Sequence, residues 1–193
     1  KVYHGYSSGA GHNNCRKAIA DNLNKRFNTD YTMNNLLMTC GAAASLNITF
    51  RALIASKDDE IIAMAPFFPE YTVFIAGQGG KQVVVPAQED MQLNLEGVKA
   101  ALSKNTKAII VNSPNNPSGV VYSESEIKAL AELLKEKSKE YGHPIYIVTD
   151  EPYRELIFEK GLVAPFIPNY YDNTVVCYSW SKSLSLPGER IGY

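Results

Sequence analysis

The segment from Ala108 to Asp150 decides the fold, and it reads AIIVN (108–112), SPNNPSG (113–119), VVYSESEIKALAELLKEKSKEYGHP (120–144) and IYIVTD (145–150). Its first and last parts are apolar almost throughout, which is typical of strands that are buried on both faces of a sheet. Between them, Ser123 and Glu126 form a capping box that begins a helix, and Gly142 ends this helix. A helix between two such strands predicts an α/β unit.

The same alternation of strands and helices extends toward both ends of the chain. A helix from about Asn13 to Phe27 is predicted by apolar residues at every fourth position, namely Cys15, Ile19, Leu23 and Phe27. Further strands are predicted at 36–40, 61–64, 82–85 and 174–178, and further helices after Gly41, before Gly77 and from Asn94 to Leu102. We therefore expect a three-layer α/β/α domain with a mostly parallel sheet sandwiched by helices.

Length and charge narrow the class of protein. A chain of 193 residues can bury one sizeable core, so we expect one compact unit. It has 19 Lys and Arg against 20 Asp and Glu, a net charge of −1 and no basic tail, which argues against nucleic acid or an anionic membrane as partner. No apolar run is long enough to span a membrane and the first residues lack a signal-peptide core, so we expect a cytoplasmic protein.

Two further features concern the chain ends and the cysteines. The chain has no initiator methionine and stops at Tyr193 inside a predicted strand, 190–193, so we expect it to be part of a longer protein. Cys15, Cys40 and Cys177 are widely spaced and show no metal-ligand pattern. We interpret them as small buried hydrophobic residues and expect no metal site.

Chemically useful groups follow four of the predicted strands: Gly41 to Ala43, Asn116, Asp150 and Lys182. The carboxyl ends of parallel strands meet at the edge where open α/β sheets bind ligands, so we expect these groups to lie together. Singly, each has an ordinary explanation: a tight helix start, a turn, a cap for a helix at Pro152, and a solvated lysine. Together they match pyridoxal phosphate, which needs a lysine for a Schiff base, an anion at the ring nitrogen, a phosphate cradle and donors to the ring phenolate.

Three sequence blocks carry a family resemblance: NNPSG (115–119), DEPY (150–153) and SWSK (179–182), the last continuing to GERIG (188–192). In this order and at these separations they resemble the signature blocks of the class I and II aminotransferases, which are fold-type I pyridoxal phosphate enzymes. The resemblance implies that residues 1–193 are the cofactor-binding large domain, without the C-terminal small domain. It also implies a transaminase that acts on an amino acid and a 2-oxo acid.

The resemblance implies a role for each group that surrounds the cofactor ring. Lys182 would form the Schiff base and then move the proton during catalysis. Asp150 would pair with the ring nitrogen, while Asn116 and Tyr153 would hydrogen-bond the phenolate oxygen. Phe68 would stack on the ring, although a role in the core suits this side chain nearly as well.

The resemblance also implies a phosphate site and a dimer. The phosphate would sit at the helix start after Gly41, on the backbone amides of Ala42 and Ala43, because free N–H groups and the helix dipole favour an anion there. Ser179 and Arg190 would complete this cradle. Alanines stand where many relatives place a hydroxyl, so more of the binding would rest on the backbone and on these two side chains.

Tyr6 matches a tyrosine that reaches the phosphate of the neighbouring subunit in relatives, and so it implies a homodimer. The arginine that binds the substrate carboxylate in relatives lies in their C-terminal part. The resemblance therefore does not name the substrate, and we expect weak or no turnover from this chain alone.

Our leading hypothesis is a pyridoxal phosphate-dependent aminotransferase with a ping-pong mechanism. One alternative is a lyase or decarboxylase of the same fold, since these reactions share the large-domain groups; the tyrosine of DEPY favours amino transfer. The other alternative is an aminotransferase-like domain that senses an effector and regulates a fused DNA-binding domain.

Overall fold

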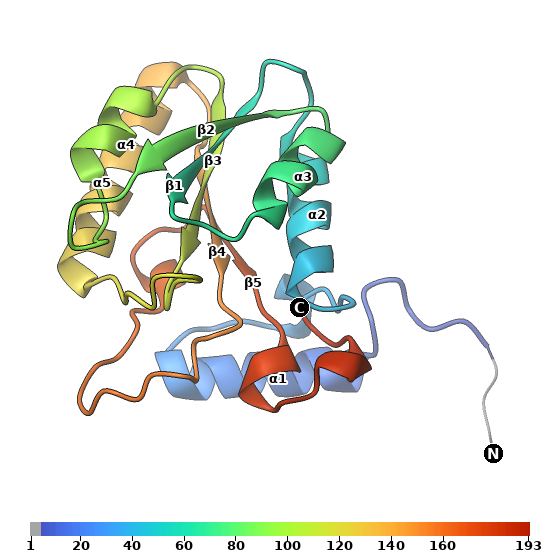
Figure 1. Ribbon diagram of the computed structural model, residues 1–193. Helices are drawn as coiled ribbons and strands as arrows, with labels where there is room; N and C mark the ends of the chain where they lie inside the picture. Colours follow the sequence, from blue (N-terminus) through green and yellow to red (C-terminus); the bar gives the residue numbers. More distant parts are fainter. Residues whose placement is uncertain (1–4) are drawn as a thin grey trace.

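The computed structural model describes residues 5–193, and these contain a sheet of five strands (Figure 1). The strands are β1 (Glu60–Ala65), β2 (Lys81–Pro86), β3 (Thr106–Asn112), β4 (Tyr146–Asp150) and β5 (Thr174–Cys177). Their order across the sheet is β2-β1-β3-β4-β5, and every neighbouring pair is parallel. All five carboxyl ends therefore lie at one edge, as the sequence predicts.

Helices cover both faces of this sheet and one of its ends. They are α1 (Asn13–Phe27), α2 (Ala42–Leu53), α3 (Glu70–Gly77), α4 (Leu95–Ala101), α5 (Glu124–Tyr141) and α6 (Trp180–Ser183), with 3-10 turns at Met33–Asn35, Ile167–Asn169 and Pro187–Glu189. Helices α4 and α5 lie on one face and α2 and α3 on the other, while α1 crosses beyond the carboxyl ends of β4 and β5 (Figure 1). This confirms the three layers. In the part of the chain that is described, no helix is long and apolar enough to cross a membrane.

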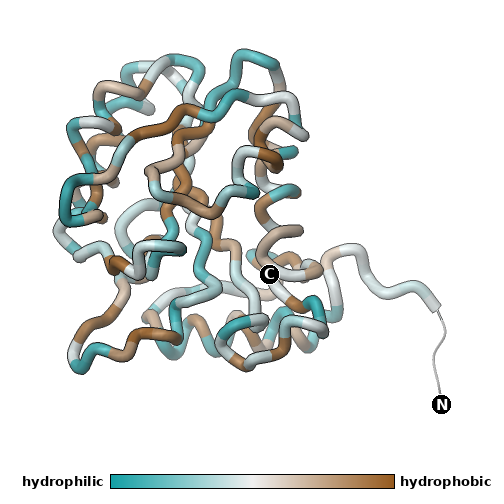
Figure 2. Tube along the Cα trace, in the orientation of Figure 1, coloured by the Kyte–Doolittle hydropathy of each residue, from teal (hydrophilic) through white to brown (hydrophobic). Residues whose placement is uncertain are grey.

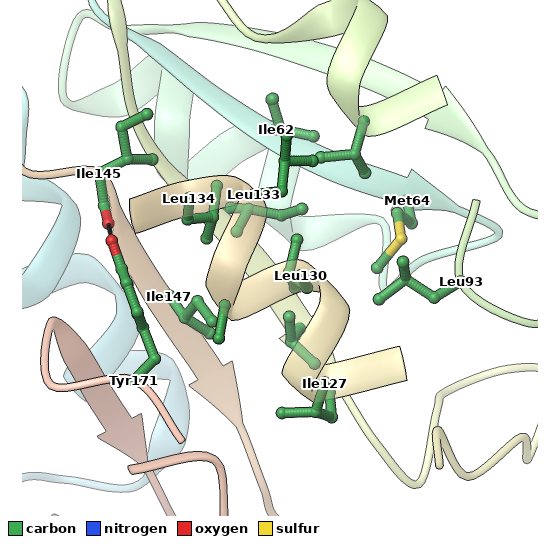
Figure 3. Packing of buried hydrophobic residues seen from close by; sticks show 14 of the residues in the cluster. Ile62, Met64, Leu93, Ile127, Leu130, Leu133, Leu134, Ile145, Ile147 and Tyr171 are labelled. Atoms are coloured by element: carbon green, nitrogen blue, oxygen red, sulfur yellow. Dashed lines mark hydrogen bonds between the residues drawn. The ribbon is translucent and has the colours of Figure 1, made fainter. Parts of the chain in front are cut away.

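The central strands bury both of their faces, which explains their apolar sequences. On β1, Ile62 and Met64 pack in the cluster that includes Leu130 of α5 (Figure 3), whereas Ile61 and Ala63 pack against α2 and α3. Successive side chains of a strand point to opposite faces, so a strand covered on both sides has no polar positions. Figure 2 shows the hydrophobic residues concentrated along the sheet and the hydrophilic ones around it.

The predicted helix ends of α5 are confirmed. The Ser123 N–H donates to Glu126 Oε2 at 2.7 Å, and the Glu126 N–H donates to Ser123 Oγ at 3.3 Å, which is a complete capping box. Gly142 ends the helix with a φ of 76°, in the left-handed region that favours glycine. Helix α5 thus begins and ends where its sequence dictates, and it positions β3 and β4 side by side.

The segment 36–40 is not a strand of the sheet, which corrects the prediction. Among the described residues it makes a single bridge, an antiparallel one between Thr39 and Gly192. A groove of about 630 Å³ is lined by Leu36 and Thr39 of this segment and by Val175 and Cys177 of β5. The segment is therefore extended and apolar but is not paired with β5, and periodicity alone does not distinguish these two situations.

The prediction of a strand at 190–193 is also wrong, because this segment does not form a regular strand. The 3-10 turn Pro187–Glu189 precedes it, and Arg190 has a left-handed φ of 50°. Gly192 bridges Thr39 on one side and Ser179 on the other, and Tyr193 exchanges backbone hydrogen bonds of 2.8 and 3.1 Å with Tyr178. A Cβ at Gly192 would meet the carbonyl oxygen of Tyr178 and, at 2.7 Å, the Cα of Gly41, so this backbone crossing requires glycine.

The buried face of α1 and the cysteines also differ from expectation. In α1 the buried residues are Arg16, Ala20 and Leu23, whereas Cys15 is exposed. Cys40 is exposed as well, and only Cys177 is buried as predicted. Arg16 is tolerated on the inner face because its guanidinium donates to backbone oxygens 2.8 to 3.2 Å away. Within residues 5–193, no three His, Cys, Asp or Glu side chains cluster as metal ligands.

Candidate active site

The ends of β3 and β4 are held together by Asn112, a residue whose role the sequence did not reveal. Asn112 and Asp150 are partners in the β3–β4 register. The Asn112 side-chain amide donates to the backbone oxygen of Asp150 at 2.7 Å, and its Oδ1 accepts from the N–H of Asn116 at the same distance. The loop that carries Asn116 is therefore tied to the strand that carries Asp150. Residues 152–155 form a turn, so Asp150 does not cap a helix.

Asp150 is buried at the end of β4, with 5 % of its surface exposed. Its Oδ2 accepts a hydrogen bond of 2.6 Å from the Tyr71 hydroxyl, whereas its Oδ1 is buried and has no partner among the described residues. Burial raises the pKa of Asp150 to about 7; the Tyr71 hydrogen bond opposes this rise and the charge of Glu151 adds to it. A buried carboxylate oxygen without a donor is costly, so this oxygen could accept a hydrogen bond from a cationic N–H group.

Tyr71 is the second residue that the sequence did not reveal. It lies in the first turn of α3 and is 1 % exposed. Burial and the nearby charge of Asp150 hold the pKa of its phenol well above the usual value, so it stays a donor to Asp150. A buried tyrosine hydroxyl needs a partner, but the sequence does not indicate which residue provides it.

The ring of Phe68 lies 5.7 Å from the ring of Tyr71 in an edge-to-face arrangement. Phe68 is half-buried, and it packs at the border of the cluster between the sheet and the α2–α3 layer. It therefore lies at the Asp150 end of the site. Both of its expected roles, stacking on a ligand ring and packing in the core, are compatible with this place.

Tyr153 connects the Asp150 end of the site with Lys182. Burial and the charge of Asp150 raise the pKa of the Tyr153 phenol, and the side chain of Asn116 lowers it, so Tyr153 lies near both groups. Lys182 is exposed on α6, and its Nζ lies 5.9 Å from the centroid of the Tyr153 ring. Side chains that follow β3, β4 and β5 thus come together, as the sequence predicts for a parallel sheet.

The start of α2 is shaped for an anion. Gly41 has a φ of 94°, and a Cβ there would lie 2.7 Å from Arg190 Nη2 and 3.6 Å from Ser179 Oγ. The N–H groups of Ala44 and Ser45 donate to the Gly41 oxygen, whereas the amides of Ala42 and Ala43 have no hydrogen-bond acceptor within the described residues. Two free amides at a helix N-terminus, with an arginine and a serine beside them, could hold a phosphate-like group.

Three side chains meet beside this helix start: Ser179, Ser181 and Arg190. Ser179 is 3 % exposed, and its Oγ lies 2.7 Å from Ser181 Oγ and accepts from the Ser181 N–H at 3.1 Å. Arg190 Nη1 donates to Ser181 Oγ at 3.2 Å and Nη2 donates to the Cys40 oxygen at 3.2 Å. Ser181 was not predicted as a site residue, although the spacing Ser-x-Ser beside the lysine was a usable signal.

Tyr6 is the one predicted site residue that lies away from the others. It is fully exposed on the N-terminal arm, which projects from the body of the domain (Figure 1). Within one copy of the chain it therefore contributes nothing to the site. The remaining predicted residues gather at the carboxyl edge of the sheet or at the start of α2.

Comparisons with known proteins agree with this architecture. The family model described as "Aminotransferase class I and II" matches residues 1–193. A probable aspartate/prephenate aminotransferase of Aquifex aeolicus is 35 % identical, over 97 % of this chain and 47 % of the relative. A probable aspartate aminotransferase of Methanocaldococcus jannaschii is 33 % identical, over 97 % and 48 %.

Solved structures give the same result. An aminotransferase from Eubacterium rectale superposes with a TM-score of 0.96 at 54 % identity, covering 98 % of this chain and 48 % of that one. Aspartate aminotransferase from Thermus thermophilus with maleate superposes with a TM-score of 0.88 at 29 % identity, covering 97 % and 48 %. The chain spans about half the length of these proteins, and it belongs to the class I and II aminotransferase family.

Proposed function

We propose that this chain is the pyridoxal phosphate-binding large domain of an aminotransferase, which exchanges an amino group between an amino acid and a 2-oxo acid. The observation that carries the proposal is the unpartnered Oδ1 of Asp150, buried where three strands end. A protonated pyridine nitrogen would supply the cation that this oxygen lacks, and its charge would keep Asp150 ionised. Both the burial and the orphaned oxygen then have a physical reason.

The other residues fit the remaining parts of the cofactor. The amides of Ala42 and Ala43, with Ser179, Ser181 and Arg190, would hold the phosphate. An anion there would accept hydrogen bonds that these groups do not complete with one another. The site therefore offers an anion cradle at one end and an anionic partner for a cation at the other, which matches the charge distribution of pyridoxal phosphate.

Four side chains would act around the ring. Lys182 Nζ would form the covalent link to the cofactor aldehyde and, once displaced by the substrate amine, carry the proton between substrate and cofactor carbons. Tyr153 and Asn116 would donate to the ring phenolate, and Phe68 would cover one face of the ring. When bound, pyridoxal phosphate supplies the electron sink that makes the substrate Cα acidic.

The proposal includes a homodimer in which Tyr6 acts on the neighbouring site. Its support is that Tyr6 is fully exposed on a projecting arm and contacts none of the other candidate residues of its own chain. For the substrate, the names of the relatives suggest aspartate and prephenate as the first compounds to assay. Both of these compounds are dicarboxylic.

The direct test is to add pyridoxal phosphate and follow the absorption of the lysine-linked cofactor. Wild type should show this absorption and, after borohydride reduction, carry the label on Lys182. Lys182→Ala should lose both signals, whereas the exposed Lys160→Ala should keep them. A reducible link that persists in Lys182→Ala would overturn the assignment.

A panel of amino acids then separates the reaction classes. The proposal predicts 2-oxo acid formation only when an amino acceptor is present, and no release of ammonia. Stoichiometric ammonia without an acceptor would indicate a lyase. Cofactor binding without any turnover in the whole enzyme would instead favour an effector-sensing domain.

A further inference from the structure

A buried ion pair lies directly beside the candidate site and is not explained by cofactor binding. It joins Glu151 and Arg154, which are 4 % and 9 % exposed. Glu151 Oε2 accepts from Nε of Arg154 and makes an ionic contact with its Nη2, and Oε1 accepts from the Thr149 hydroxyl at 2.8 Å. Both carboxylate oxygens are thus satisfied, so the pair is fully built rather than an incidental surface contact.

The guanidinium of Arg154 lies against three aromatic rings and the hydroxyl of a fourth, all from separate parts of the chain. Its Cζ lies 5.0 Å from the ring centroid of Tyr178, 5.1 Å from Phe166 and 5.3 Å from Phe27. Its Nη1 also approaches the hydroxyl of Tyr193 at 3.4 Å. A planar cation between aromatic faces gains cation–π attraction in several directions, so its position is fixed more firmly than an ion pair alone would fix it.

The pair brackets the turn that carries Tyr153. The Glu151 N–H donates to the Cys177 oxygen at 2.9 Å, which anchors the start of the turn to the end of β5, and the Arg154 N–H donates back to the Glu151 oxygen at 3.3 Å. Tyr153 lies between the two partners, and its ring is the one that Lys182 Nζ approaches. The contacts of the Arg154 guanidinium are with Glu151 and the aromatic rings, so its effect on the site has to pass through the turn.

We infer that Arg154 is a positioning residue: its ion pair with Glu151, held in the aromatic cage of Phe27, Phe166, Tyr178 and Tyr193, orients the Tyr153 phenol toward the cofactor phenolate and Lys182. This inference rests on the proposed function.

The test compares Arg154→Lys with Tyr153→Phe in the cofactor-loaded enzyme. Lysine keeps the charge but loses the planar fork and the stacking. Tyr153→Phe removes a hydrogen-bond donor to the cofactor phenolate. It should therefore raise the pH midpoint at which the absorbance of the lysine-linked cofactor changes. Arg154→Lys should shift this midpoint in the same direction and lower kcat about ten- to a hundredfold with little change in KM, since misplacement of a group by about 1 Å has effects of this size.

The decisive step is the double variant. If Arg154 acts through Tyr153, adding Arg154→Lys to Tyr153→Phe should cause no further shift of the absorbance midpoint, because the oriented group is already gone. Additive shifts, or an Arg154→Lys enzyme with the wild-type midpoint, would overturn the inference. If wild type itself forms no lysine-linked cofactor, it is the proposed function that fails.

Two further variants separate positioning from folding. Arg26→Lys is the matched control. Arg26 also forms an ion pair with a glutamate, Glu155, and its guanidinium lies 4.9 Å from the Phe27 ring, but this ion pair is partly exposed. Arg26→Lys should leave the midpoint and kcat unchanged. If Arg154→Lys folds poorly, the double variant Glu151→Gln with Arg154→Met removes both charges together. The inference is supported if this double variant regains the thermal stability of the cofactor-free protein but still shows a shifted pH midpoint of the cofactor absorbance. A wild-type midpoint in that double variant contradicts it.

Discussion

The two ends of the candidate site are built in different ways. The Asp150 end lies on β4, an inner strand, and it is enclosed by Tyr71, Asn112 and the neighbouring strands. The Lys182 end follows β5, the edge strand, on a helix of four residues, and Lys182 and Arg190 are both exposed. The fold thus holds Asp150, the proposed partner of the ring nitrogen, in place in advance, while Lys182 and Arg190, the groups proposed for the aldehyde and the phosphate, remain accessible to an incoming cofactor.

The largest effect is expected at the buried end. Asp150→Asn keeps the size of the side chain and an acceptor for Tyr71, but it removes the anion that would stabilise a protonated ring nitrogen. We expect the single-turnover rate to fall on the order of a thousandfold, about 4 kcal/mol in the barrier, with cofactor still bound. A variant that retains more than a tenth of the wild-type rate would show that the buried end does not control the chemistry.

The next prediction concerns the stability of the cofactor-free protein. The pKa of Asp150 rises from 3.8 to about 7 on folding, so the folded state holds a proton that the unfolded state releases between these values. The contribution of this bound proton to the free energy of unfolding is complete below about pH 4 and is lost as the pH rises toward 7. The free energy of unfolding falls by up to about 1.4 kcal/mol per pH unit in this range. Urea unfolding from pH 4 to pH 8 should show this decline in wild type relative to Asp150→Asn. Parallel curves would contradict the raised pKa.

A substitution at Gly41 tests the exposed end. Alanine there would adopt a left-handed φ, and its methyl group would also displace Arg190 Nη2. Gly161→Ala is a matched control, because Gly161 has a similar φ of 87° and nothing within 4 Å of the added Cβ. Both should lose about 1 to 2 kcal/mol of stability from strain. Only Gly41→Ala should also weaken cofactor binding, about tenfold or more, as measured by fluorescence titration. Equal affinities would argue against the cradle.

The smallest effect is expected at Ser181. Its hydroxyl accepts from Arg190 and meets Ser179, so Ser181→Ala should raise the dissociation constant of pyridoxal phosphate about two- to tenfold, the range of one neutral hydrogen bond. Ser123→Ala is the control, because it should destabilise α5 by about 1 kcal/mol without changing cofactor affinity. A dissociation constant that is unchanged in Ser181→Ala would leave Ser179 and Arg190 as the only side chains of the cradle.

The sequence predicted the sheet well, because strands buried on both faces and a complete capping box are local signals. It also predicted that Asn116, Asp150 and Lys182 meet at one edge, since they follow the parallel strands β3, β4 and β5. The Gly41 turn was predicted to follow a strand at 36–40, which is not part of the sheet. It did not reveal Tyr71 or Asn112, whose partners are distant in the sequence. Side chains at 36–40 and 190–193 have the composition of strands, but pairing there depends on which backbone lies alongside, and a local pattern does not specify that.

The contact between Gly41 and Gly192 has a consequence for the dimensions of the site. Gly192 bridges both Thr39 and Ser179, and its Cα position leaves no room for a side chain against Gly41. The helix start that would hold the phosphate and the segment that carries Lys182 are therefore joined by main chain rather than by flexible side chains. The distance between the start of α2 and the backbone of Lys182 is thus set by the main chain, and only the lysine side chain can adjust the remaining reach to a ligand.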